Sequence, residues 1–127
     1  MRFSKKLVPF IAALTAMAAV PVLAQAGLSI GGSRAHFGVH AVRGGFMPDP
    51  AKIDVVSGGN LAASAAGAPA ACAGFVTAPP DAIVNYSNPA DMLRFFVDGA
   101  GDTTLVINDA QGNWHCNDDT DGVDPMV

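Results

Sequence analysis

DMLRFFVDGAGDTTLVINDAQGNWHC, residues 91–116, is the stretch that decides the fold of this chain. The alternation over residues 91–97 places Leu93, Phe95 and Val97 on one face, and residues 103–107 show the same pattern, which is typical of half-buried strands. Residues 99–102 predict a hairpin loop between these two strands. Asp109-Ala110-Gln111-Gly112 has the residue preferences of a type I turn, and it leads into a further strand pattern at residues 113–116.

The residues before this stretch carry shorter strand patterns, separated by turns rich in Gly, Pro and Asn. They predict strands at 52–56, 61–63, 74–77 and 82–86. Residues 62–71 are rich in Ala, but Gly67 and Pro69 interrupt them, so we expect a loop. Every acidic residue of the chain is Asp rather than Glu, which also favours turns over helices. The sequence therefore predicts an all-β fold, a small antiparallel β-sandwich.

The first 26 residues have the layout of a cleavable signal peptide. Arg2, Lys5 and Lys6 are followed by an uncharged apolar stretch that ends in Ala24-Gln25-Ala26. We expect cleavage after Ala26, with no stable membrane insertion afterwards, and a protein that is periplasmic or secreted. Residues 27–50 are glycine-rich without a regular period and predict an extended N-terminal arm, so that residues 51–127 form the β-sandwich domain.

Cleavage would leave four basic and eleven acidic residues, a net charge of −7. Such a surface argues against nucleic acid as a partner, because phosphate neutralisation requires clustered Lys and Arg. Cys72 and Cys116 are the only cysteines. In an oxidising compartment this pair predicts a disulfide bond, against the alternative of two free thiols.

The chain stops at Val127, just after residues 124–127 begin to resemble a new strand. A sandwich cut inside its last hairpin would expose strand edges and an open core. We therefore expect the domain to lack its last strands.

Residues 45–127 resemble a group of exported bacterial proteins related to the pre-peptidase C-terminal domain, which are often labelled peptidases by association. The most specific part of the resemblance is residues 102–107, and the other matching residues are Gly112, Trp114, Cys116-Asn117-Asp118-Asp119, Gly122 and Pro125. Residues 46–50 and Cys72 are similar to earlier landmarks of the group. A later Gly-x-Tyr-x-x-Trp-Val-Gly segment of the group is absent, and Asp124 stands where Asn is usual. The resemblance implies a β-sandwich, of jelly-roll type, that acts as an accessory domain with no reaction of its own.

The acidic loop after Cys116 is a candidate cation site. Its oxygen-bearing side chains alternate as in the first half of a Ca²⁺ loop. The candidate ligands are Asn117, Asp118, Asp119 and Asp121. An EF-hand would also need a bidentate Glu at its twelfth position and flanking helices, which this sequence does not offer. The alternative is a solvated turn capped by its own side chains.

Three further patterns have plainer alternatives. His36 and His40 have the spacing of a helical zinc motif, but no Glu follows His36, so adventitious binding is the simpler interpretation. Ser33 follows two glycines but lacks the context of a nucleophile elbow, and about a hundred residues are too few for a trypsin-like peptidase. Trp114 and Tyr86 could form a platform for sugar. We favour instead a Trp114 that packs on the disulfide, because it shares a strand face with Cys116.

These observations predict a non-catalytic exported module that binds an unidentified protein or polysaccharide. Two alternatives remain: a Ca²⁺-dependent carbohydrate- or surface-binding module, and a fragment of a secreted hydrolase.

Overall fold

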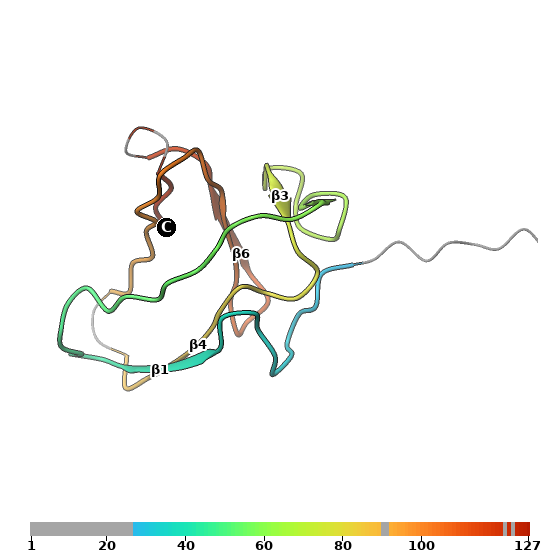
Figure 1. Cartoon of the computed structure of the whole chain (residues 1–127). Coiled ribbons are helices and arrows are strands. Elements are labelled where there is room, and N and C mark those ends of the chain that lie inside the picture. Colours follow the sequence, from blue (N-terminus) through green and yellow to red (C-terminus); the bar gives the residue numbers. More distant parts are fainter. Residues whose placement is uncertain (1–26, 90–91, 121, 123) are drawn as a thin grey trace, which may run out of the picture.

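The structure is a computed structural model that describes residues 27–89, 92–120, 122 and 124–127. The predicted signal peptide lies outside these residues. The described residues form short strands and no helix, so the all-β prediction is confirmed at this level. The strands are β1 (Val39–Arg43), β2 (Leu61–Ala62), β3 (Phe75–Val76), β4 (Ile83–Ser87), β5 (Leu105–Asn108) and β6 (Trp114–Asn117). They pair as β1–β4, β2–β3 and β5–β6 (Figure 1).

The β5–β6 hairpin follows from the turn that the sequence predicts. The Gly112 amide donates to the Asp109 carbonyl at 2.9 Å, which closes a four-residue turn, and Gly112 adopts a left-handed φ of 86°. Glycine takes this conformation without steric cost. The turn sets an antiparallel register in which Asn108 faces Trp114 and Val106 faces Cys116.

The predicted hairpin between residues 91–97 and 103–107 is wrong. Residues 95–97 instead pair with residues 125–127: the Phe95 amide donates to the Val127 carbonyl at 2.7 Å, and the Val127 amide returns a bond of 2.8 Å. The loop at 99–102 contains two glycines and imposes no fixed turn, whereas the 109–112 turn fixes its flanking residues directly. The expectation that residues 124–127 take up a strand-like conformation is met by this pairing.

The antiparallel prediction is also corrected by β1 and β4, which pair in parallel with Val39 opposite Ile83 and Arg43 opposite Ser87. Figure 1 shows the two strands side by side. A parallel pair requires a long crossover, and residues 44–82 provide it. β1 lies within the predicted N-terminal arm, in which no strand pattern is present, so the arm is joined to the rest of the fold through β4.

Residues 52–56 form no strand, so the strand predicted there is wrong, and the strand predicted at 61–63 has a different neighbour. Leu61 pairs instead with Val76, and Ala62 with Phe75. The loop predicted at residues 62–71 is observed from Ala63 onward, whereas Ala62 belongs to β2. A strand of two residues makes few hydrogen bonds, so its partner is selected by long-range packing rather than by its own sequence.

The apolar core among the described residues is small and includes the disulfide. Ala63 and Cys72 are buried, with 0% and 2% of their surfaces exposed. The third buried member is Ala68, and the partly buried side chains packed against these three are Leu28, Val76, Val106, Trp114 and Cys116. The predicted bond between Cys72 and Cys116 is formed, with a Cα–Cα distance of 5.3 Å. The preferred packing of Trp114 against the disulfide region is confirmed.

Large apolar side chains remain exposed elsewhere. Phe75 is 67% exposed and Val56 is 75% exposed. A domain that buries so little apolar surface has a small hydrophobic contribution to its stability. No helix in the described part of the chain is long and apolar enough to cross a membrane.

Candidate functional site

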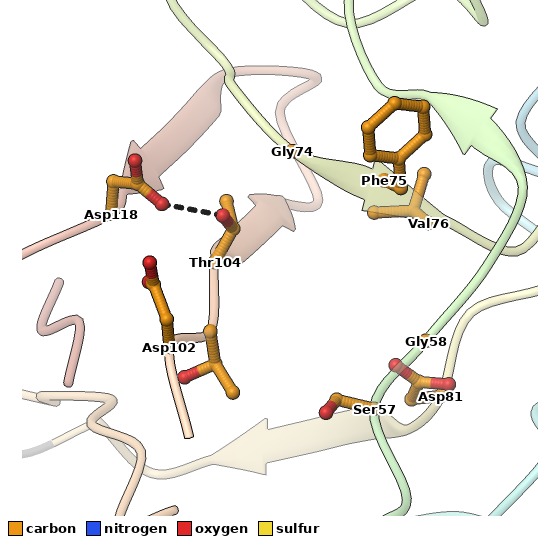
Figure 2. Close-up of a pocket in the computed structure, with 10 residues that line it drawn as sticks. Ser57, Gly58, Gly74, Phe75, Val76, Asp81, Asp102, Thr104 and Asp118 are labelled. Atoms are coloured by element: carbon orange, nitrogen blue, oxygen red, sulfur yellow. Dashed lines mark hydrogen bonds between the residues drawn. The ribbon is translucent and has the colours of Figure 1, made fainter. Parts of the chain in front are cut away.

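A pocket of about 420 Å³ lies where several segments distant in sequence approach one another. Residues 57–58 and Asp81 lie on one side, residues 74–76 form an apolar wall, and residues 102–104 with Asp118 lie opposite (Figure 2). The disulfide joins β6, which leads to Asp118, to the segment that leads into β3. The covalent link therefore holds two walls of the pocket near each other.

Two glycines allow the walls to approach closely. A Cβ on Gly59 would overlap the backbone carbonyl of Val76, so only glycine fits beside β3 at this point. A Cβ on Gly74 would lie 2.9 Å from the Cβ of Thr104, and Gly74 also has a left-handed φ of 89°. Both positions need the smallest residue for the segments to pack as they do.

The pocket is acidic. Asp81, Asp102 and Asp118 line it, and no Lys or Arg is among its lining residues. Figure 2 shows Asp102 and Asp118 on one side and Asp81 beside Ser57 on the other. Partial burial raises the pKa of Asp81, and His36, whose Nδ1 lies 3.8 Å from Asp81 Oδ1, lowers it by a smaller amount. Burial of the carboxylate therefore outweighs the attraction to His36 in its effect on the pKa of Asp81.

Two threonine hydroxyls also line the pocket. Thr104 Oγ1 donates to Asp118 Oδ1 at 2.5 Å, which orients that carboxylate. Thr103 Oγ1 is buried from solvent and has no hydrogen-bond partner in the described structure. A buried hydroxyl without a partner costs about 1–3 kcal/mol.

The acidic loop after β6 is held mainly by hydrogen bonds within the protein. Asn117 Oδ1 accepts bonds from Thr120 Oγ1 at 2.8 Å and from the Met126 amide at 3.1 Å. Asp118 faces Thr104 instead of the loop interior. No group of three or more His, Cys, Asp or Glu side chains in the described part of the chain is placed to hold a metal ion.

Asp119 is exposed, with no hydrogen bond from its side chain in the described structure, and Asp121 lies outside the described residues. In the structure the side chains of Asn117 and Asp118 form hydrogen bonds within the protein. The structure does not test whether the four candidate ligands together bind Ca²⁺. The Ca²⁺ site remains a prediction.

A second acidic group, Asp109, organises the β5–β6 turn. Its Oδ1 accepts from the amides of Gln111 at 2.9 Å and Asn113 at 2.8 Å. Its Oδ2 lies 3.1 Å from His115 Nε2 and accepts from Asn113 Nδ2 at 3.0 Å. His115 and then Asn113 are the main causes that hold the pKa of this carboxyl well below its usual value.

We expect Asp109→Ala to lower the melting temperature at pH 7, because the turn amides lose their acceptor. Because the pKa of Asp109 is lower in the folded than in the unfolded protein, its carboxylate stabilises the fold at pH values above 3.8, the ordinary pKa of Asp. This contribution is lost progressively as the pH falls below 3.8. The difference between wild type and variant should therefore narrow in melts recorded from pH 7 down to about pH 2. Asp98→Ala, at an exposed aspartate outside this turn, is the matched control. A constant difference across the pH range would contradict the assignment.

The histidine pair singled out by its spacing does not form a site in the described structure. His40 Nε2 lies 2.9 Å from the Phe37 carbonyl oxygen, whereas His36 faces Asp81. His40 is part of β1 and not of a helix. The two imidazoles thus have separate partners, and the spacing of His36 and His40 does not bring them together on a helix as a zinc motif would require.

The hydroxyl of Ser57 lines the same pocket as Asp81, which in turn faces His36. A nucleophilic serine needs a base within hydrogen-bond reach, and the described contacts place no hydrogen bond between Ser57 and His36. The arrangement therefore lacks the geometry of a catalytic triad. Tyr86 lies in β4 and Trp114 in β6, so the two aromatic residues belong to different sheets.

The residues that form the pocket were mostly missed at the level of sequence. Of the residues that line it, only Asp118 is among the candidate ligands that the sequence predicts. Asp81 follows two prolines and Asp102 follows a glycine, positions that are ordinary for turns. Nothing in their spacing indicates that they converge.

A scan against known protein families and searches of curated proteins and solved structures found no match to this chain. The resemblance to the pre-peptidase C-terminal domain therefore stays a prediction from the sequence.

Proposed function

We propose that the chain is an exported, non-catalytic accessory module that binds a macromolecular partner through the acidic pocket. The observation that carries this proposal is the pocket itself, in which three carboxylates, hydroxyl groups and an exposed phenyl ring surround about 420 Å³. Concave sites that combine an apolar wall with a few convergent polar groups are typical of binding sites.

Two features support binding over catalysis. No hydrogen bond in the described structure joins the Ser57 hydroxyl to a carboxylate or imidazole that could activate it as a nucleophile. The pocket also borders exposed apolar surface at Phe75, which adds contact area for a large partner. The disulfide is compatible with export to the periplasm or the medium, and the signal pattern of residues 1–26 supplies the route.

We further propose that the three strand pairs assemble as a small β-sandwich similar to the pre-peptidase C-terminal domain. The sequence pattern around Trp114 and Cys116 supports this proposal, as does the packing of Trp114 against the disulfide region. In such a sandwich the pocket would lie on the outer surface, where an accessory domain meets its partner.

Chemical-shift mapping of the ¹⁵N-labelled, oxidised protein tests the function. Neutral oligosaccharides, basic peptides, acidic peptides and Ca²⁺ are titrated separately. We expect at least one oligosaccharide or peptide to shift amides at residues 57–58, 74–76 and 102–104. Shifts confined to residues 117–122 on addition of Ca²⁺ would favour the Ca²⁺-dependent module instead. If none of the oligosaccharides or peptides shifts the amides that line the pocket, the proposal is contradicted.

A further inference from the structure

Residues 45–60 connect β1 to β2 without a backbone–backbone hydrogen bond in the described structure. The bonds before this segment end at the Gly44 amide, and those after it begin where Leu61 pairs with Val76. From residue 51 to residue 59 the backbone forms neither a turn nor a bend. Figure 1 shows the segment as a long green trace outside the strand pairs. A protease can therefore take up this segment without first separating paired strands.

The basic residues decide which bond of the segment is cut. Those that follow the predicted leader are Arg34, Arg43, Lys52 and Arg94. Only Lys52 lies in the unpaired segment, and its side chain is exposed. Arg43 is part of β1, and Arg94 directly precedes the residues that pair with 125–127. Arg34 lies in a shorter unpaired run, residues 30–35, which is bounded on both sides by backbone hydrogen bonds.

We infer that the Lys52–Ile53 peptide bond is a site of limited proteolysis by a protease that holds a basic side chain in an acidic specificity pocket. The step is a hydrolysis. Water adds across the amide and its C–N bond breaks, which leaves a carboxylate on Lys52 and an ammonium group on Ile53. Exposed segments with few backbone contacts are where such cuts concentrate.

The cut leaves residues 27–52 joined to the rest of the protein by noncovalent contacts alone, because both cysteines lie after the cut. The parallel pairing of β1 with β4 holds the two pieces together. Further bonds run from the Leu28 amide to the Ala66 carbonyl at 3.0 Å and from the His36 amide to the Pro80 carbonyl at 3.0 Å. None of these contacts involves the segment that is cut. The cut protein therefore remains a two-piece complex, and the arm leaves only when β1 separates from β4.

Limited digestion of the oxidised protein with trypsin, followed by intact-mass measurement, tests this inference. We expect the first cut beyond residue 26 to fall between Lys52 and Ile53. The two pieces should elute together in size-exclusion chromatography, and they should separate in guanidinium chloride without a reductant. Lys52→Gln should abolish this first cut, because the protease requires a basic side chain before the bond. Arg94→Gln removes the same charge at an exposed residue outside the segment and should leave the rate of the first cut unchanged.

Four results would overturn the inference. A first cut after one of the arginines would show that residues 45–60 are not the most accessible segment. The same conclusion would follow from a wild-type protein that stays intact while its reduced form is digested. Equal slowing by Lys52→Gln and Arg94→Gln would reduce the effect to overall charge. Separate elution of the two pieces without denaturant would show that the pairing of β1 with β4 does not hold the arm.

Discussion

Gly59→Ala is expected to lower the free energy of unfolding by about 3 kcal/mol or more, an effect at the upper end of overpacking changes. The added Cβ would overlap the backbone of Val76, and backbone atoms cannot rotate away as a flexible side chain can. Val76 is also fixed by its pairing with Leu61. Relief of the overlap requires β3 to separate from residues 57–59, so the pocket wall is lost together with the packing.

Thermal unfolding followed by circular dichroism measures this effect. A loss of about 3 kcal/mol corresponds to a decrease in melting temperature of about 12 °C or more for a domain of this size. Gly32→Ala is the matched control, because a Cβ at Gly32 meets nothing within 4 Å and its φ is not left-handed. The control should melt close to wild type. A Gly59→Ala protein that melts with the control would show that the two segments do not pack as described.

Local chemistry explains the parts of the fold that the sequence predicts correctly. The 109–112 turn needs only Asp at its first position and Gly at its last. The hydrogen bond that closes it, from the Gly112 amide to the Asp109 carbonyl, spans four residues. The strand at β4 follows from a run of β-branched and aromatic residues bounded by a proline turn. With only two cysteines in the chain, an oxidising compartment leaves a single intramolecular pairing for the disulfide.

Pairings between distant segments could not be predicted. β2 and β3 contain two residues each, so their own sequences carry little information about a partner. The parallel pairing of β1 with β4 depends on a crossover whose path is set by packing. The strand pattern in residues 103–107 names no neighbour. The turn at Asp109 brings β5 against β6, whereas residues 95–97 pair with residues 125–127, far away in the sequence.

The same reason explains why the pocket was missed. Its carboxylates come from positions 81, 102 and 118, and their convergence depends on the close approaches at Gly59 and Gly74. The acidic loop after Cys116 was conspicuous in the sequence because its side chains are adjacent. Adjacent side chains in a turn find partners within that turn, as Asn117 does with Thr120.

Loss of the disulfide has the largest expected effect on stability. The bond closes a loop with a sequence separation of 44 residues. In the chain-entropy model such a closure contributes about 4 kcal/mol. Typical domains are stable by only about 5–15 kcal/mol. The buried apolar residues of the described part of the chain are few: Ala63, Ala68, Pro125 and Cys72 itself. Cys72→Ala combined with Cys116→Ala should therefore lower the free energy of unfolding by about 4 kcal/mol and lower the urea midpoint accordingly.

The Cys72–Cys116 bond contributes more than the apolar core to holding the pocket-bearing domain together. Urea unfolding of the wild-type protein in its oxidised and reduced forms tests this contribution most directly, with the double alanine variant as the control for side effects of the reductant. The predicted result is a midpoint that falls by about 2 M or more on reduction, with no further change when reductant is added to the variant. Equal midpoints for the oxidised and reduced wild-type protein would contradict the claim.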